Sequence, residues 1–564
     1  MKRYQSILFA AFLVLAVVGG VGLNIVPTNI DRTSHVVMTS DGVSISFDLY
    51  YKAPLSSPEP VIVIGHGIIV NKEMMTDIAI ELAEHGFIVA SLDWRSHGQS
   101  GGTLVIARLI YDLDAVIAAI PTLIPYTNMS AIGLIGYSMG GWPTYDYATN
   151  HTSVKAWIAV ASSPSGTGNT TSPANVLVIH GAEDEAFSQQ TVIANLSKIT
   201  TTSEGLPAGQ KVVPGTLYGN ISNGTARELI VLPFADHLST PWDRRSVALV
   251  TSWMVRTFYG VTPNTSVMAY DGRLALLIVG TIGLVGTVYG FSMYVAGIPS
   301  IKRRLQVREG GTIPQAMIDT TRPATFVASY FGWMFLLIPT AALPALLFLT
   351  PEFFTAFLTL LAATLAINML LAIWHWFRKN GQGVAYRNFL KANLLAPGGT
   401  WMIGILCAVA FEVGFYAIIG LNYLGTIPAA QKVPYLFLYG PITFFTFYVF
   451  GIFVQKIVMP IVEAKTRIKK PAILFVVQGL VSYVLVFAWF TIIIMVPCMI
   501  LGNYFLALIV IITAPIMLFA TFAGVHLEKV TGSPVPLALI MGVFLTLLTL
   551  TLSWVGSISV VGFF

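Results

Sequence analysis

The chain has 564 residues, of which 55% are hydrophobic and only 10% are charged, and its mean hydropathy is +0.75. This composition excludes an ordinary water-soluble protein, and the length excludes a single average domain. The net charge of +5 is compatible with nucleic-acid binding until the basic residues are placed along the chain.

Long apolar runs occur at the N-terminus and throughout the second half of the chain. A run of about 20 apolar residues can cross a bilayer as a helix. Nine runs reach this length, at 7–26, 273–298, 325–349, 353–377, 400–424, 434–456, 472–499, 503–526 and 536–561. The residues between the first two runs have a normal globular composition. We therefore expect an N-terminal transmembrane anchor at 1–26, a water-soluble domain at 27–270 and a transmembrane domain of about eight helices at 271–564.

The basic residues outside the soluble domain fall almost entirely on alternate loops. One side of the predicted membrane carries Lys2, Arg3, Lys302, Arg303, Arg304, Arg308, Arg322, Arg378, Lys379, Arg387, Lys391, Lys456, Lys465, Arg467, Lys469, Lys470 and Lys529. The other side has only Arg273 and Lys432. Because positive residues mark the cytoplasmic face, we expect residues 27–270 to lie outside the cytoplasm, and we expect no nucleic-acid partner.

Two further patterns concern this orientation. Asn-x-Ser/Thr sequons occur only in the soluble domain, which agrees with an extracytoplasmic position. The first apolar run could instead be a cleaved signal peptide, but its length and the lack of a small-x-small site favour an uncleaved anchor. Both alternatives place the soluble domain on the same side.

Within the soluble domain, short apolar strands alternate with helical segments. The segment 35–51 alternates around Asp41-Gly42, as a β-hairpin does. Buried strands follow at "VIVIGHG", "FIVASLDW", "SAIGLIG", "VKAWIAVAS", "NVLVIHG" and "ELIVLPFA", with helices expected near 72–85, 108–120, 140–149 and 243–258. This alternation predicts an α/β fold with a doubly wound, mostly parallel sheet.

Polar residues with catalytic chemistry follow three of these strands. In "AIGLIGYSMGGW", Ser138 occupies a tight strand-to-helix turn that would present its hydroxyl above the sheet. Asp184 follows "VLVIHG", and His237 follows "LIVLPFA". Because sites in such sheets gather at the carboxyl ends of the strands, we expect these three side chains to meet.

The chain order Ser, Asp, His is that of the α/β-hydrolases, and the soluble domain resembles this superfamily. Within it, the resemblance is to the serine aminopeptidase and monoacylglycerol-lipase-like branch. It covers nearly all of residues 35–258 and rests on "GHG", "DWRSHGQSGG", "GYSMGG", "HGAEDE" and "ADH" in this order. Family members often have glycine where this chain has Ser96, a difference in a turn that should not touch the nucleophile.

The resemblance implies a serine hydrolase with a triad of side chains. Ser138 would be the nucleophile and His237 the base that takes its proton. Asp184 would hold the imidazole in the correct tautomer. Glu183 and Glu185 compete for this last role, and Asp184 is preferred on the family pattern.

The negative charge that develops during acyl transfer requires two N–H donors. The backbone N–H of Met139 is one, and the resemblance implies that Ile68 supplies the other. His66 is then expected to organise the turn after its strand. The loop residues Asp93, Arg95 and His97 are expected to fix their own loop, with substrate contact as the alternative.

The sequence predicts neither a metal nor a cofactor, because no His, Cys or Asp cluster has ligand spacing and no glycine-rich loop fits a phosphate. Between about 164 and 176 there is hardly room for a helical lid. The segment 188–228 is longer than one crossover helix requires. We therefore expect an open site, partly overhung by about 205–225 or by the membrane surface.

The eight later spans exceed what tethering requires, and they could form a structural bundle or a dimerisation platform. Ionisable residues inside a membrane are a functional hint. Glu412 lies in the middle of one predicted span, where Asn422 or Gln478 could pair with it, and His375 lies near a cytoplasmic end. We find no internal repeat of the kind that transporters contain.

Three functions remain open from the sequence. The leading hypothesis is an integral membrane serine hydrolase that cleaves acyl esters outside the cytoplasm, with small-molecule or lipid-like substrates and membrane lipids as its partners. A peptidase for short peptides is the alternative within the enzymes. A transport or signalling protein that uses the hydrolase fold as a binding module is the rival from another class. A homo-oligomer formed through the transmembrane domain is left open.

Overall fold

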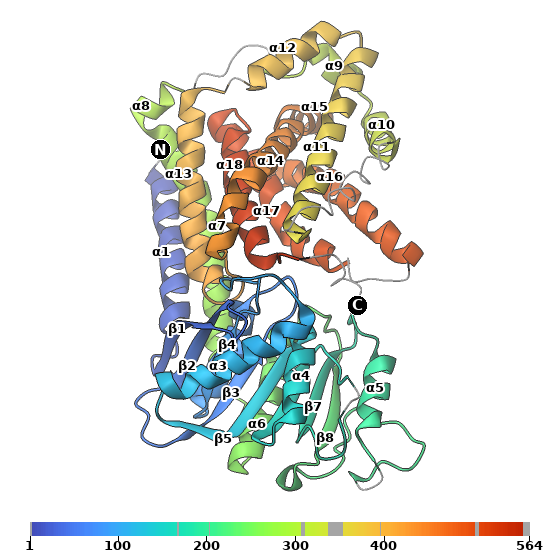
Figure 1. The fold of residues 1–564 in the computed structure, drawn as a ribbon. Helices are drawn as coiled ribbons and strands as arrows, with labels where there is room; N and C mark the ends of the chain where they lie inside the picture. Colours follow the sequence, from blue (N-terminus) through green and yellow to red (C-terminus); the bar gives the residue numbers. More distant parts are fainter. Residues whose placement is uncertain are drawn as a thin grey trace.

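The computed structural model describes residues 3–165, 168–201, 204–305, 311–336, 353–394, 396–501 and 507–556. A part built on a β-sheet lies below a region made entirely of helices (Figure 1). The two parts are joined in the chain by helix α1, which precedes the sheet, and by helix α7, which follows it.

The sheet has eight strands in the spatial order β1-β2-β4-β3-β5-β6-β7-β8. In chain order they are β1 (Ile30–Met38), β2 (Ser44–Lys52), β3 (Glu59–Gly65), β4 (Ile88–Leu92), β5 (Thr127–Tyr137), β6 (Val154–Val160), β7 (Val176–Gly181) and β8 (Arg227–Leu232). Strand β2 pairs antiparallel with β1 and with β4, and every other pair is parallel. The predicted hairpin and the predicted mostly parallel sheet are both confirmed.

Helices cover both faces of this sheet. They are α2 (Thr76–Glu84), α3 (Leu109–Leu123), α4 (Gly141–Asn150), α5 (Gln189–Lys198) and α6 (Arg244–Tyr259). Alternate residues of β3 point to opposite faces, so Val61 and Val63 pack with α3 and α4 while Ile62 and Ile64 pack with α2 and α6. Such strands are apolar throughout because both faces are buried. The predicted α/β fold class is therefore confirmed.

The helical region contains most of the second half of the chain. Its helices are α1 (Arg3–Ile25), α7 (Ala269–Gly297), α8 (Pro299–Lys302), α9 (Gln315–Thr320), α10 (Pro323–Leu336), α11 (Phe353–Lys379), α12 (Gly383–Leu394), α13 (Gly398–Phe415), α14 (Val433–Ile452), α15 (Met459–Thr466), α16 (Pro471–Leu501), α17 (Ala507–Thr531) and α18 (Val535–Leu552). Short π-helical turns extend α13 and α14.

Eight helices in the described part of the chain are long and apolar enough to cross a membrane. They coincide with eight of the nine apolar runs found in the sequence. The remaining run, 325–349, begins in α10, and its residues from 337 onward lie outside the described part.

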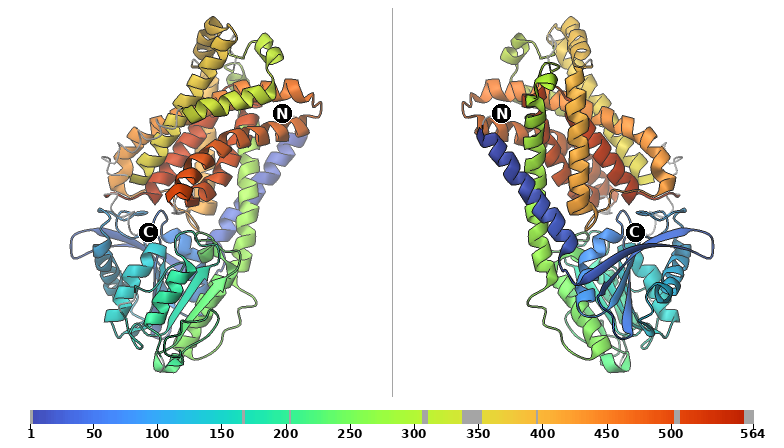
Figure 2. Two further views of the ribbon diagram at one scale, coloured as in Figure 1. Left: turned by 90° about the vertical axis from the view of Figure 1, so that its right-hand side faces the viewer. Right: turned by 90° about the vertical axis from the view of Figure 1, so that its left-hand side faces the viewer.

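Helices α1 and α7 run side by side from the sheet into the helical region (Figure 2). Glycines allow this contact: a Cβ on Gly19 would lie 2.2 Å from the Cα of Gly280, and a Cβ on Gly283 would lie 2.1 Å from the backbone nitrogen of Ala16. Small residues permit such close backbone approach between apolar helices. Helix α1 is therefore packed closely against α7.

The sheet part and the helical region share a buried polar contact. Nε of Arg273 in α7 lies 2.7 Å from Oδ1 of Asp77 in α2, and both side chains are buried. Nη1 of the same arginine donates to the carbonyl of Leu23 at the end of α1. A charge pair buried in this way holds the two helices in one geometry. Moving them apart would leave each charge buried without its partner, which is strongly unfavourable.

The sequence analysis offered Asn422 or Gln478 as a partner of Glu412, and this prediction is wrong. Asn422 instead accepts a hydrogen bond from Nη2 of Arg273 at 3.0 Å, and Gln478 donates to the carbonyl of Met459 at 3.2 Å. Spacing along the apolar runs could not reveal this, because the arginine comes from a different helix.

Candidate active site

The serine of the Gly-x-Ser-x-Gly sequence lies at the turn between β5 and α4. The φ angle of Ser138 is +49°, a left-handed value that few residues other than glycine adopt. A Cβ on Gly136 would lie 2.4 Å from the Cα of Gly141, and a Cβ on Gly140 would lie 2.4 Å from the carbonyl oxygen of Gly65. The turn therefore requires glycine on both sides of the serine, which explains the local sequence.

Side chains from the ends of three strands form one hydrogen-bonded chain. Nε2 of His237 lies 2.8 Å from Oγ of Ser138, and Nδ1 of the same ring lies 3.0 Å from both carboxylate oxygens of Asp184. Because a carboxylate only accepts hydrogen bonds, Nδ1 carries the proton of the neutral ring and Nε2 accepts from the serine hydroxyl. The structure thus brings together the three residues that the sequence analysis selected.

The loop after β7 holds the Asp184 carboxylate. Its Oδ1 accepts the backbone N–H groups of Ala186 at 2.9 Å and Phe187 at 2.8 Å. Burial alone would raise the pKa of Asp184, but the hydrogen bond from His237 and the backbone N–H of Phe187 lower it below its usual value. The carboxylate is therefore ionised at neutral pH and able to stabilise a positive charge on the ring.

The two competing acids are placed differently. Oε2 of Glu185 accepts the backbone N–H of His237 at 3.1 Å, so this residue binds the main chain rather than the imidazole. Burial raises the pKa of Glu185 above its usual value. Glu183 is exposed. Of the three neighbouring acids, Asp184 is the one at hydrogen-bond distance from the ring.

Two residues that position the hydrogen-bonded chain were not predicted from the sequence. The hydroxyl of Ser162, just after β6, donates to the carbonyl of Ser138 at 2.9 Å, and the Tyr137 hydroxyl donates to the carbonyl of His237 at 3.1 Å. Both fix the backbone of a residue in the hydrogen-bonded chain. The position of Ser162 at the carboxyl end of a strand was the available signal for it, whereas nothing in the pattern distinguishes Tyr137.

His66 has the turn-organising position that the sequence analysis expected. Its Nδ1 lies 2.6 Å from the carbonyl of Gly67, and its Nε2 accepts the backbone N–H of Trp94 at 3.2 Å. The imidazole is fully buried, and this burial lowers the pKa of His66 to about 4. A neutral ring with both nitrogens in use joins the loops after β3 and β4.

The polar side chains after β4 fix their own loop. Asp93 accepts from the backbone N–H and from Nζ of Lys72, at 2.8 Å and 3.2 Å. Arg95 forms two hydrogen bonds with Asp112 through Nε and Nη2. The ring of His97 packs against His66. Neither cavity at Ser138 is lined by Asp93, Arg95 or His97, so the geometry favours loop fixing over substrate contact.

Two cavities meet at Ser138. The first lies against the helical region, and its far wall consists of Phe354 of α11 and Leu508, Ile509 and Ile512 of α17. The second lies within the sheet part and has a mixed wall that includes Trp142, Ser163, Phe187, Thr191 and Asn195. A substrate at Ser138 can therefore extend in two directions, one of them into apolar surroundings.

The residues expected to supply oxyanion donors lie beside these cavities. Ile68 lines both of them, and Met139 lines the second. Gly67 directly precedes Ile68 in the chain. A Cβ on Gly67 would lie 2.9 Å from the Cβ of Ser138, so the backbone that carries Ile68 runs close to the serine.

The sequence analysis predicts an open site, partly overhung by about 205–225 or by the membrane surface, and the prediction of an open site is wrong. Ser138 is only 3% exposed. Neither cavity is lined by residues of that segment, and the apolar cover comes from α11 and α17. The sequence offered no signal for these residues, because Phe354 and Ile509 stand in apolar runs like many others.

Within the described residues, no group of three or more His, Cys, Asp and Glu side chains is arranged to hold a metal ion.

Comparison with known proteins finds both a matching family and similar individual proteins. Residues 56–178 match the family described as serine aminopeptidase, S33. A monoacylglycerol lipase from Mycolicibacterium smegmatis is 26% identical over 207 residues, which cover 36% of this chain and 71% of the lipase.

Similar solved structures include an esterase from Pyrococcus furiosus, with 17% identity and a TM-score of 0.33, which is matched over 42% of this chain and 96% of its own. An α/β serine hydrolase without a lid from Xanthomonas campestris has 19% identity and a TM-score of 0.30, over 42% and 96% of the two chains. The sequence matches, the sheet order and the serine turn after β5 together identify the part of the chain from β1 to α6 as an α/β-hydrolase, and the protein as a serine hydrolase.

Proposed function

We propose that this protein is a membrane-bound hydrolase that cleaves acyl esters of lipid-like or other hydrophobic substrates. The observation that carries the proposal is the hydrogen-bonded chain from Asp184 through His237 to Ser138, at the junction of an α/β-hydrolase and an apolar helical region. An activated serine beside an apolar wall suits an ester with a hydrophobic acyl group.

The geometry supports a two-step acyl transfer. Oγ of Ser138 attacks the ester carbonyl while Nε2 of His237 accepts its proton, and the Asp184 carboxylate stabilises the resulting imidazolium. The imidazolium then gives this proton to the departing alkoxide, which leaves as the alcohol and leaves the acyl group on Ser138. A water molecule, deprotonated by the same ring, attacks the acyl-enzyme. The imidazolium returns this proton to Oγ of Ser138 as the acid is released.

The tetrahedral oxyanion formed in each step needs donors that are already in place. The backbone N–H groups of Met139 and Ile68 are proposed for this role. Both belong to short backbone segments next to the serine, and Ile68 lines both cavities that meet at Ser138.

Two observations favour an ester of lipid type. The cavity that faces the helices has the aromatic ring of Phe354 and three aliphatic side chains of α17 on its wall. The sequence relative from Mycolicibacterium smegmatis is named as a monoacylglycerol lipase.

The chemistry is proposed to take place outside the cytoplasm, in a domain spanning about residues 27–270. The short helices α8 and α12, which carry or adjoin basic residues, lie at the end of the helical region away from the sheet (Figure 1). With basic loops on the cytoplasmic face, the hydrolase part is on the other side. A homo-oligomer is not required by any of these steps.

A fluorophosphonate label tests the enzymatic function directly. We expect it to modify the wild-type protein in detergent and to spare Ser138→Ala. Failure to label the wild type, under conditions in which a control serine hydrolase reacts, would count against an enzyme and for a binding module.

A panel of p-nitrophenyl esters and aminoacyl anilides then separates the two enzymatic alternatives. We expect turnover of the esters to exceed turnover of the anilides. Preferential cleavage of the anilides would instead identify a peptidase.

A further inference from the structure

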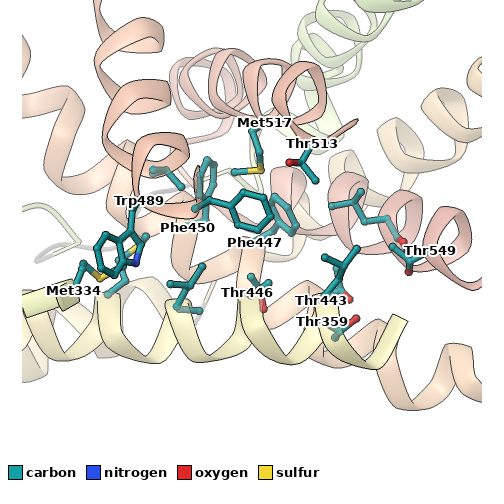
Figure 3. Close-up of a pocket in the computed structure, with 18 of the residues that line it drawn as sticks. Met334, Thr359, Thr443, Thr446, Phe447, Phe450, Trp489, Thr513, Met517 and Thr549 are labelled. Carbon is teal, nitrogen blue, oxygen red and sulfur yellow. Dashed lines mark hydrogen bonds between the residues drawn. The ribbon is translucent and has the colours of Figure 1, made fainter. Parts of the chain in front are cut away.

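An apolar cavity lies inside the helical region, between α10, α11, α14, α16, α17 and α18 (Figure 3). Among the residues that line it, Phe447 and Phe450 lie between Met334 and Trp489 on one side and Thr359 and Thr549 on the other. The cavity has a volume of about 130 Å³.

The wall of this cavity is chemically close to hydrocarbon. Among the described residues that line it, none carries a charge. Four of its threonine hydroxyls donate to carbonyls of their own helices: Thr443 to Tyr439 at 2.9 Å, Thr446 to Ile442 at 3.0 Å, Thr513 to Ile509 at 2.6 Å and Thr549 to Leu545 at 2.7 Å. Hydroxyls satisfied in this way need no partner inside the cavity. Such a wall suits an acyl chain and does not suit a polar or ionic cargo.

The cavity and the site at Ser138 share two helices. On α11, Phe354 lines the cavity at the serine, and Leu358 lines the intramembrane cavity one helical turn further on. On α17, Ile509 and Ile512 line the cavity at the serine, and Thr513 lines the cavity inside the helical region. The two spaces are therefore neighbours along the same helix pair.

The residues that line the two cavities extend together over a greater length than the acyl chains of one leaflet. From Phe354 to Met369, the lining residues of α11 span about 22 Å at the α-helical rise of about 1.5 Å per residue. One leaflet's acyl chains fill roughly 15 Å, half of the hydrocarbon core of a bilayer. A path along these residues is long enough for an acyl chain whose ester end lies at the serine.

We propose that the cavity between α11, α14 and α17 is the acyl-chain site of this enzyme, so that the transmembrane helices select substrates by chain length. The inference rests on the proposed function, because it assigns a binding site to the acyl half of the ester that the enzyme is proposed to cleave. The ester carbonyl lies at Ser138, the chain extends past Phe354 into the cavity, and the alcohol lies in the second cavity at the serine. This gives the helices a role in recognition beyond tethering.

Filling the cavity from α11 tests the assignment. Ala362 lines the cavity and its neighbour Ala363 does not, although both are partly exposed residues of the same helix. We expect Ala362→Phe to lower kcat/KM for p-nitrophenyl palmitate at least about 10-fold, the effect of expelling about two methylenes from an apolar site. We expect p-nitrophenyl butyrate hydrolysis to stay unchanged, and Ala363→Phe to resemble the wild type with both esters.

A second variant, Met517→Trp, fills the same cavity from α17 and should produce the same selective loss. Labelling by a short fluorophosphonate shows whether each variant retains a folded site, and a variant that does not label is replaced by the other. The wild type supplies a test that needs no variant, because its kcat/KM must rise from the butyrate to the palmitate ester.

Three outcomes would overturn the proposal: no preference of the wild type for the longer chain, an unchanged chain-length profile in a labelled cavity variant, or an equal loss in Ala363→Phe. These results are separable from failure of the proposed function. If one of these outcomes occurs and the wild type still hydrolyses the butyrate ester and reacts with the fluorophosphonate, the hydrolase assignment stands and only the acyl-chain site is refuted. If the wild type does neither, the proposed function itself fails.

Discussion

The side-chain ammonium of Lys432 donates a hydrogen bond to the backbone carbonyl of Ser96 over 2.7 Å. The same ammonium donates to the carbonyls of Leu550 and Ser553 at the end of α18, at 2.9 Å and 2.6 Å. Ser96 has a φ of +70° and its hydroxyl accepts the backbone N–H of Val555. The residue at which this chain departs from the family pattern is therefore a point of attachment to the helical region.

The first prediction concerns this attachment. Lys432→Met should lower the free energy of unfolding by roughly 3 kcal/mol, because it leaves three buried carbonyls without a charged donor. Thermal unfolding in detergent measures the change. Lys391→Met, at an exposed lysine of α12, is the control and should have little effect. Equal stability of the two variants would show that the contact does not hold the parts together.

The second prediction concerns the hydrogen-bonded chain. Ser138→Ala and His237→Ala should each abolish ester hydrolysis almost completely while leaving the fold intact, because members of such a chain act as a unit. Asp184→Asn should lower kcat by about 10⁴-fold through the wrong imidazole tautomer. Steady-state kinetics with one short ester measure all three variants.

Glu183→Gln is the matched control for the acid, since Glu183 is exposed. It should retain wild-type activity. Strong activity in Asp184→Asn together with its loss in Glu183→Gln would transfer the role to the neighbouring residue.

The third prediction concerns the turn that carries the serine. Gly140→Ala should destabilise the protein by about 3 kcal/mol or more and prevent fluorophosphonate labelling, because its Cβ would lie 2.4 Å from the Gly65 carbonyl oxygen. Gly272→Ala, at an open position of α7, should leave labelling unchanged. Normal labelling of Gly140→Ala would contradict this prediction, because it would show that the turn accommodates a Cβ at position 140 and still keeps the serine reactive.

The fourth prediction is a loss of stability in acid. Burial lowers the pKa of His66 from 6.5 to about 4, so the unfolded chain binds a proton at this residue before the folded protein does. The contribution of neutral His66 is complete above about pH 6.5 and is lost as the pH falls towards 4, by roughly 3 kcal/mol in total.

Thermal unfolding between pH 4 and pH 7 measures this effect, and His66→Gln isolates it. Burial also lowers the pKa of His97, so both histidines act in the same direction and only part of the wild-type slope should disappear in the variant. An identical pH dependence in wild type and variant would contradict the assignment.

The fifth prediction is the side of the membrane on which hydrolysis takes place. With the buried Cys407 and Cys498 replaced by alanine, a membrane-impermeant maleimide should label Ser188→Cys in intact cells. It should label Arg303→Cys only after permeabilisation, since the basic loops are expected in the cytoplasm. Both positions are exposed in the structure. The opposite labelling pattern would reverse the proposed orientation.

The sequence was sufficient where the physical cause of a structure is local. The apolar β3 strand is readable because alternate residues such as Val61 and Ile62 must both be buried. The turn at Ser138 is readable because glycine alone fits beside it. Chain order and family resemblance then selected Asp184 and His237, which the fold brings to the same strand edge.

Local patterns also located eight apolar helices, because crossing a bilayer requires a long apolar run whatever its neighbours are. They could not say which faces of those helices meet. A run that is apolar all round carries no periodic signal for a contact, so nothing marked Phe354 or Ile509 as part of the wall beside Ser138.

The tertiary structure decided how the two parts meet. Lys432 and Ser96 are separated by 336 positions, and Arg273 and Asp77 by 196, yet each pair is buried and in hydrogen-bond contact. Such pairs form only after the sheet and the helices have folded, because their energy depends on removing both groups from water together. The sequence by itself determined the elements and the reactive residues, and the packing of α11 and α17 over the sheet edge decided that the serine is buried beside an apolar wall.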